Sequence, residues 1–206
     1  VSGLTFNEAR KRIEDAVSAA VIGTQCLVSL SKIRSIQIFV LGNAFKPGAY
    51  TVSSLSNISN VLFFAGGPTQ YGSLRNIDVK RNGDNIGTFD FYDLLIKGNT
   101  KSDLNLNSND ALVINPSGKT VLIYGEVRKE AKFELLENET FSDLEKFASG
   151  FLNTADKSKV TLSRIVDKGE RLFTNYTYET IQNIELKDGD EIFVHKLSNT
   201  PRNIIN

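Results

Sequence analysis

The stretch that decides the fold reads Ile38-Phe-Val-Leu-Gly42-Asn-Ala-Phe-Lys46-Pro-Gly-Ala-Tyr50. It returns 83 positions later as Val121-Leu-Ile-Tyr-Gly125-Glu-Val-Arg-Lys129-Glu-Ala-Lys-Phe133. The same offset relates Phe64-Ala-Gly-Gly67 to Phe147-Ala-Ser-Gly150. It falls to 80 between Leu106 and Leu186, which a short deletion in a surface loop explains. The sequence therefore predicts two copies of one small domain.

Composition excludes several classes of protein. The 206 residues include 24 basic and 24 acidic side chains, so no net field favours nucleic acid or an anionic membrane. The single cysteine, Cys26, supplies neither a disulfide framework nor a cysteine metal site. Apolar stretches fall short of the roughly 18 to 20 residues of a membrane-spanning helix, and no signal peptide is visible. Because the chain contains no methionine, we expect an excised or mature piece of a longer protein.

Three regions follow from the repeat: residues 1–35, 36–118 and 119–206. In the first region, Thr5-Phe-Asn-Glu8 is a capping box, and apolar residues recur every three or four positions after it, so a helix is expected. The helix is expected to end at Gly23. Cys26, Val28 and Leu30 then alternate with other side chains, which predicts a strand.

Each repeat is predicted to run strand, turn, strand, short helix, strand, loop, strand, with the helix packed on a small mixed sheet. The expected inward helix faces are Ile58, Val61, Leu62 and Ala65 in the first copy, and Phe141, Leu144, Phe147 and Ala148 in the second. The expected matched core pairs are Val40 with Ile123, Phe64 with Phe147, and Leu106 with Leu186. The residues assigned to turns and close approaches are Gly42, Pro47, Gly48, Gly66, Gly67, Asp110, Gly125, Gly189 and Asp190.

Catalytic chemistry finds little support in this sequence. His195 is the only histidine, and no serine or cysteine near it lies in a recognisable nucleophile motif. The glycines at 66 and 67 follow a helix, whereas a phosphate-binding loop precedes one. We therefore expect no catalytic residues, no metal site and no cofactor.

More residues are candidates for binding a ligand or another subunit, although each could also be an ordinary surface or packing residue. Arg81 and Arg164 occupy matching strand positions and could clamp an acidic sugar or a carboxylate of another subunit, or be solvated strand residues. Tyr71 could stack on a sugar ring or pack at a rim. Arg128 and Lys129 belong to a dense group of mixed charges on the first hairpin of the second copy, and Lys46 lies on the matching hairpin. Such charge suits a wet contact with another subunit, or an ordinary soluble surface.

The Gly-Asn-Ala-Phe-Lys-Pro-Gly-Ala-Tyr run from Gly42, the Ala65-Gly-Gly67 helix end and the segment Leu106 to Ile114 resemble the SLBB domain, the soluble-ligand-binding β-grasp module. Two such domains after a helix and a strand are similar to the periplasmic part of bacterial outer-membrane polysaccharide export proteins. The resemblance implies an α+β fold of two tandem β-grasp domains. The second copy keeps Gly125-Glu-Val127 but lacks the Pro-Gly of the hairpin.

The resemblance also implies a function. Subunits of that family form a ring that conducts capsule or exopolysaccharide, and an inner-membrane polysaccharide copolymerase is the expected partner beside the exported polymer. The chain would then be periplasmic and held at the outer membrane by segments it does not contain, with no nucleic acid partner and no membrane insertion of its own. The alternative is a soluble glycan- or small-ligand-binding β-grasp module.

Overall fold

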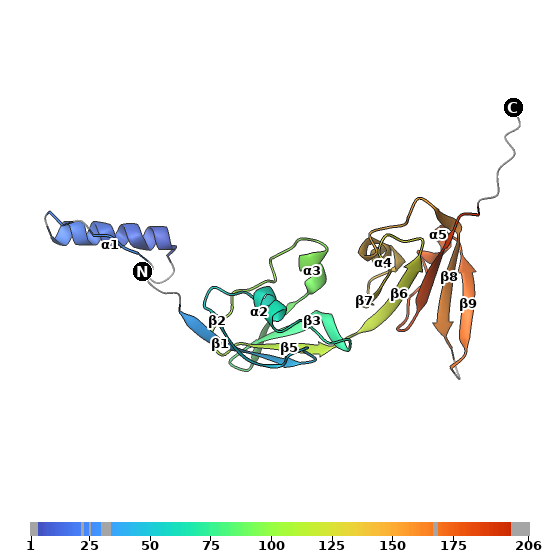
Figure 1. Ribbon diagram of the computed structural model, residues 1–206, viewed down its shortest axis with the longest axis horizontal. Coiled ribbons are helices and arrows are strands. Elements are labelled where there is room, and N and C mark those ends of the chain that lie inside the picture. The colour runs from blue at the N-terminus through green and yellow to red at the C-terminus, as the bar shows by residue number, and fades with distance from the viewer. Residues whose placement is uncertain (1–3, 22, 25, 30–33, 167–168, 199–206) are drawn as a thin grey trace, which may run out of the picture.

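The computed structural model describes residues 4–21, 23–24, 26–29, 34–166 and 169–198. Figure 1 shows helix α1 at one end of an elongated molecule, followed by one sheet and then a second. In chain order the elements are α1 (Phe6–Ala20), β1 (Ser35–Gly42), β2 (Gly48–Ser53), α2 (Ile58–Phe64), β3 (Gly72–Arg81), β4 (Asp84–Phe89), α3 (Phe91–Leu95), β5 (Ala111–Pro116), β6 (Lys119–Gly125), β7 (Ala131–Leu135), α4 (Phe141–Phe147), β8 (Ala155–Ile165), β9 (Arg171–Tyr176), α5 (Tyr178–Ile181) and β10 (Glu191–Lys196). We call β1 to β5 the first domain and β6 to β10 the second.

The two domains have the same topology. The strand order is β2-β1-β5-β3-β4 in the first sheet and β7-β6-β10-β8-β9 in the second. In each sheet the central pair, β1 with β5 and β6 with β10, is parallel, while the other pairs are antiparallel. One helix, α2 or α4, follows the first hairpin in each. The expected α+β fold with two β-grasp-like domains is confirmed.

The loop expected before the last strand of each repeat is wrong, because it contains a strand and a short helix. In the first domain β4 pairs with β3 across Asn82 and Gly83, whose φ angles are 52° and 93°. Positive φ at both central residues is the type I′ hairpin turn, which Asn-Gly strongly favours. The Asn-Gly pair was therefore a visible signal for a fifth strand.

The helices carry the predicted cores. Ile58, Val61, Leu62 and Ala65 are buried in the first domain, and Phe141, Leu144, Phe147 and Ala148 in the second. Asn57 and Thr140 are the N-caps of α2 and α4. In two of the three expected core pairs, Val40 with Ile123 and Leu106 with Leu186, both residues are buried.

The third pair is only half right. Phe147 is 5% exposed, but Phe64 is 71% exposed. Phe147 is covered by Tyr92 of the first domain, whose ring centroid lies 5.0 Å away. Phe64 occupies the same helix position, but no aromatic ring among the described residues packs against it. The difference therefore arises from the neighbouring domain and not from the helix.

The N-terminal region matches the expectation in part. Helix α1 begins with the complete Thr5–Glu8 capping box, but it ends at Ala20 and buries none of its residues. Residues 26–29 are not in a strand, and Leu30 lies outside the described residues. A strand requires a hydrogen-bonding partner, and no described segment pairs with residues 26–29. The predicted N-terminal strand is therefore wrong over those four residues.

Gly42 and Gly125 explain why the decisive stretch contains a glycine in both copies. Their φ angles are 76° and 93°. A Cβ at either position would lie 2.3 Å from a backbone oxygen of the last strand, that of Ile114 or Val194. Only glycine allows the first strand to pass so close to its parallel neighbour.

The remaining turn residues lie at element ends. Pro47 precedes β2, which begins at Gly48, and the Tyr50 hydroxyl donates to the Lys46 carbonyl, at 2.6 Å, across this turn. Gly66 and Gly67 end α2 with φ angles of 79° and 73°. Asp110 and Asp190 directly precede the last strand of each domain.

Candidate functional site

The two domains meet at the edge strand β7, where side chains of the first domain bind its exposed backbone. The N–H of Glu134 donates to the Tyr92 hydroxyl at 3.0 Å, and its carbonyl accepts from Arg75 Nη1 at 3.4 Å. Tyr92 belongs to α3, yet it packs within the hydrophobic core of the second domain. The outward backbone groups of Glu134, on an otherwise open edge strand, are thereby hydrogen-bonded.

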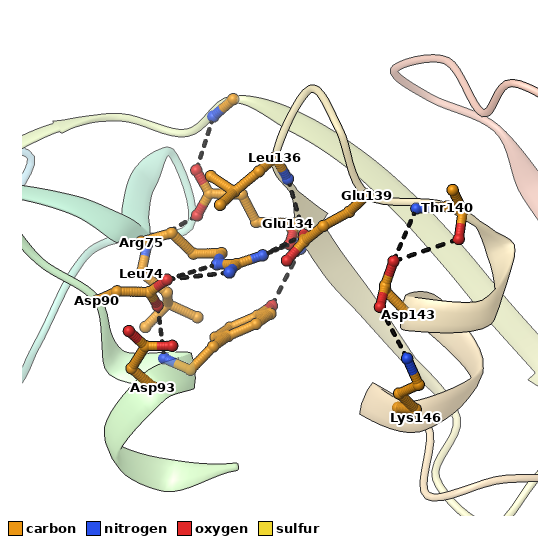
Figure 2. A network of polar contacts seen from close by, with 12 residues as sticks. Leu74, Arg75, Asp90, Asp93, Glu134, Leu136, Glu139, Thr140, Asp143 and Lys146 are labelled. Carbon is orange, nitrogen blue, oxygen red and sulfur yellow. Dashed lines mark hydrogen bonds and ion pairs between the residues drawn. The ribbon is translucent and has the colours of Figure 1, made fainter. Parts of the chain in front are cut away.

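Arg75 is the centre of this junction. It is 3% exposed, and Figure 2 shows its guanidinium group held between Asp90 and the Glu134–Glu139 side. Asp90 accepts two hydrogen bonds from it, at 2.9 and 3.0 Å, and Glu139 of the second domain accepts another. The guanidinium also lies over the Tyr92 ring, 4.6 Å from its centroid. We call Arg75, Asp90, Glu134, Glu139 and Tyr92 the junction cluster.

The junction cluster contains one cation, Arg75, and three carboxylates, two of which bind the guanidinium group directly. Burial alone would lower the pKa of Arg75, but hydrogen bonds to Glu139 and Asp90 outweigh it and keep that pKa above its ordinary value. Burial raises the pKa of Tyr92, so its hydroxyl stays neutral at pH 7. Arg75 is therefore charged and Tyr92 neutral at pH 7, and both are held by hydrogen bonds that cross the junction.

Glu134 joins the two domains a second time. Its carboxylate accepts from the Ser73 hydroxyl at 2.7 Å, from the Leu74 N–H at 2.8 Å and from the Gly118 N–H at 2.8 Å. Gly118 lies between β5 and β6, so this one carboxylate binds β3 and the interdomain connection together. A buried carboxylate with several donors is a stable arrangement.

Sequence reasoning missed the junction cluster, although one signal was present. Arg75 lies two and four residues before Ile77 and Val79, which are buried on the same strand. A charged residue in the buried phase of a strand indicates a partner charge. The counterparts of Arg75 and Glu139 in the other copy are Ser158 and Ser56, so the ion pair is absent from the repeat pattern.

Arg81 and Arg164, predicted as ligand or interface residues, each form an ion pair inside their own domain. Arg81 forms two hydrogen bonds to Asp110, at 2.9 and 2.8 Å, and Arg164 forms two to Asp190, at 2.8 and 2.7 Å. Burial would raise the pKa of Asp110, but hydrogen bonds from Arg81 and the Asn107 N–H outweigh it, so the pKa is lowered. Each pair fixes the turn before the last strand.

The other predicted binding residues lie at separate places. Lys46 and Tyr71 are exposed on the first domain, and Tyr71 is 69% exposed. Lys129 places its Nζ 5.6 Å from the centroid of the Phe133 ring. Arg128 is exposed and lines a cavity of the second domain. His195 lies 2.7 Å from the Thr161 hydroxyl, and burial lowers its pKa.

That cavity, which we call the corner cavity, has a volume of 470 Å³. It lies between the end of α4 and the start of β8 and is lined by Arg128, Glu145, Ser149, Gly150, Phe151, Leu152, Asn153, Ala155 and Lys157. Tyr178 of α5 borders it, because its hydroxyl donates to Glu145 at 2.9 Å and Lys157 Nζ lies 5.0 Å from the centroid of its ring. It is a concave, polar site on the second domain.

Neither a metal-binding cluster nor a membrane-spanning helix occurs among the residues that the structure describes. Histidine, cysteine, aspartate and glutamate side chains do not gather in that part of the chain into a group able to hold a metal ion. Within the same residues, no helix has the length and apolar character needed to cross a membrane.

Comparison with known families supports the resemblance for the first domain. Residues 37–89 match the model of the SLBB domain, a segment that covers β1 to β4. The SLBB domain is a non-catalytic ligand-binding module that also occurs in polysaccharide export proteins. No curated protein matches the chain. The fold and this match show two β-grasp-like domains of one topology, the first of which matches the SLBB domain over β1 to β4.

Proposed function

We propose that this chain is the periplasmic, non-enzymatic part of an outer-membrane channel that exports capsule or exopolysaccharide. The observation that carries the proposal is the SLBB match of residues 37–89, because that module occurs in polysaccharide export proteins. The second domain has the same strand order, so we take it as a second SLBB module. No bond is made or broken in this role.

The mechanism we propose is steric and electrostatic. The buried Arg75 and Glu134 hold the two modules in one fixed orientation, which suits a protein that must keep an aqueous conduit open. Several copies would close into a ring through a heterologous interface, as rotational symmetry allows. The exported polysaccharide would pass along the ring, and an inner-membrane copolymerase would deliver it.

The direct test uses cells that make the full-length protein. An internal deletion of residues 36–198 should abolish surface polysaccharide, while the polymer made inside the cell keeps its sugar composition. Membrane fractions analysed by immunoblotting give the level of the variant, so loss of the protein is distinguished from loss of function. Normal surface polysaccharide with the deleted protein at wild-type level would contradict the proposal.

A second candidate function is a soluble glycan- or small-ligand-binding module, favoured by the corner cavity. Its volume of 470 Å³ falls within the roughly 300 to 1,000 Å³ of small-molecule sites. Isothermal titration of the 206-residue chain with oligosaccharides tests for binding, and the deletion experiment in cells tests for export; binding by a chain that is not needed for export would favour this second function.

A further inference from the structure

The corner cavity has a counterpart in the first domain, and the two differ sharply in chemistry. The first-domain corner is lined by Phe63, Gly66, Gly67, Pro68, Leu74, Phe91 and Leu95. At the offset of 83, Leu74 corresponds to Lys157, and the neighbouring Phe45 corresponds to Arg128. Phe91 and Tyr178 both begin the last short helix of their domains. Apolar residues of one copy are thus replaced at one place by cationic and polar residues in the other.

Neither cation of the corner cavity is neutralised by a carboxylate in the described part of the chain. Arg128 and Lys157 are exposed, and neither forms an ion pair with a residue in the described part of the chain. By contrast, Lys146, the residue after the cavity residue Glu145, forms an ion pair with Asp143 at 3.0 Å. Two unpaired cations at one concave site attract an anion such as a carboxylate.

The remaining groups in the cavity suit hydroxyl groups. Glu145 accepts from Tyr178 with one oxygen and has further acceptor capacity, while the Asn153 amide can both donate and accept. A sugar ring presents hydroxyl groups that do both, and its carboxylated forms add one negative charge. An acidic peptide would use the two cations but would leave the Glu145 carboxylate facing like charge, which disfavours it.

We propose that the corner cavity binds an acidic sugar unit, a uronic acid within a glycan, with Arg128 and Lys157 on its carboxylate and with Glu145 and Asn153 on its hydroxyl groups. The inference rests on the proposed function and names the chemical class of the polymer. The first-domain corner, which lacks these four groups, does not bind it.

The test is isothermal titration of the full 206-residue chain with a tetramer of galacturonic acid, and with maltotetraose as the neutral probe. We expect saturable binding of the acidic tetramer and at least about tenfold weaker binding of the neutral one. The variant Arg128→Phe/Lys157→Leu introduces the residue types found at the matching positions of the first domain. It should weaken binding of the acidic tetramer by at least about tenfold. The control Arg12→Phe/Lys101→Leu makes the same change in charge at exposed sites elsewhere. Thermal melts confirm that each variant is folded.

Absence of saturable binding, equal binding of the neutral tetramer, or equal weakening by the control pair would each overturn the inference. A folded chain that instead binds polyglutamate as well as galacturonate would assign the cavity to an acidic protein partner and overturn it too. This titration measures sugar binding, whereas the deletion experiment in cells measures export of the polysaccharide. If the protein is required for export but binds no acidic tetramer, the inference about the corner cavity is wrong, while the proposed channel role is unaffected.

Discussion

At the scale of single residues, Ser149 adopts a left-handed backbone conformation at a position where the first domain has a glycine. Its φ is 62°, while Gly66, at the same place after α2, has a φ of 79°. A side chain with a Cβ is disfavoured in this left-handed region, whereas glycine adopts it freely. The second domain therefore stores strain at the end of α4.

We predict that Ser149→Gly raises the free energy of unfolding by about 0.5 to 1 kcal/mol, because relief of strain exceeds the added chain entropy. Urea denaturation with linear extrapolation measures the change. The reciprocal variant Gly66→Ser should lower stability, since its Cβ would lie 2.9 Å from Phe45 Cδ1. A stability unchanged or lowered by Ser149→Gly would show that the turn is not strained.

Individual residues of the Arg–Asp pairs were predictable, but the pairs were not. Asp110 and Asp190 stood out as turn residues, and Arg81 and Arg164 as matching strand residues. Nothing local in the sequence joins an arginine to an aspartate 29 positions later, as in Arg81 with Asp110. The signal that could have joined them is that both members recur in both copies.

At the scale of elements, α2 and α4 have the same pattern of apolar residues but different tertiary neighbours. Both helices have a phenylalanine at their last position, Phe64 or Phe147, but only Phe147 is buried, beneath Tyr92 of the other domain. Burial at this position is therefore imposed by the tertiary neighbour.

We predict that Phe147→Ala lowers the free energy of unfolding by about 3 to 5 kcal/mol, the usual cost of a phenylalanine removed from a core. The matched variant Phe64→Ala should cost less than about 0.5 kcal/mol, because that side chain is mostly in water. Chemical denaturation of both variants measures the difference. Equal losses would mean that Phe64 is covered in solution.

Elements specified by local signals were predictable, whereas those that depend on distant partners were not. The capping boxes, the helix faces and the turn glycines depend on residues a few positions apart, and they predicted α1, α2 and α4 correctly. Residues 26–29 alternate like a strand, but alternation cannot supply a pairing partner. The hairpin at Asn82-Gly83 was a local signal that our interpretation of a loop overlooked.

At the scale of the whole molecule, the junction cluster decides whether the two domains act as one body. Arg75 of the first domain pairs with Glu139 of the second, and Tyr92 completes the second core. The sequence comparison could not predict this, because a repeat shows what two copies share and the junction uses residues that only one copy has. Removing Arg75 would leave two carboxylates, Asp90 and Glu139, without their cation in a mostly buried site.

We predict that Arg75→Met separates the unfolding of the two domains and destabilises the junction by about 3 to 5 kcal/mol, the usual cost of breaking a buried ion pair on one side. Differential scanning calorimetry should then show two transitions where the wild-type chain shows one. Adding Glu139→Gln should recover part of the loss, because it removes one of the uncompensated charges. The control Arg81→Met breaks an ion pair within the first domain and should lower stability without splitting the transition. If Arg75→Met still unfolds in one transition, the domains are coupled mainly through the packing of Tyr92 on Phe147, and Tyr92→Ala becomes the variant that separates them.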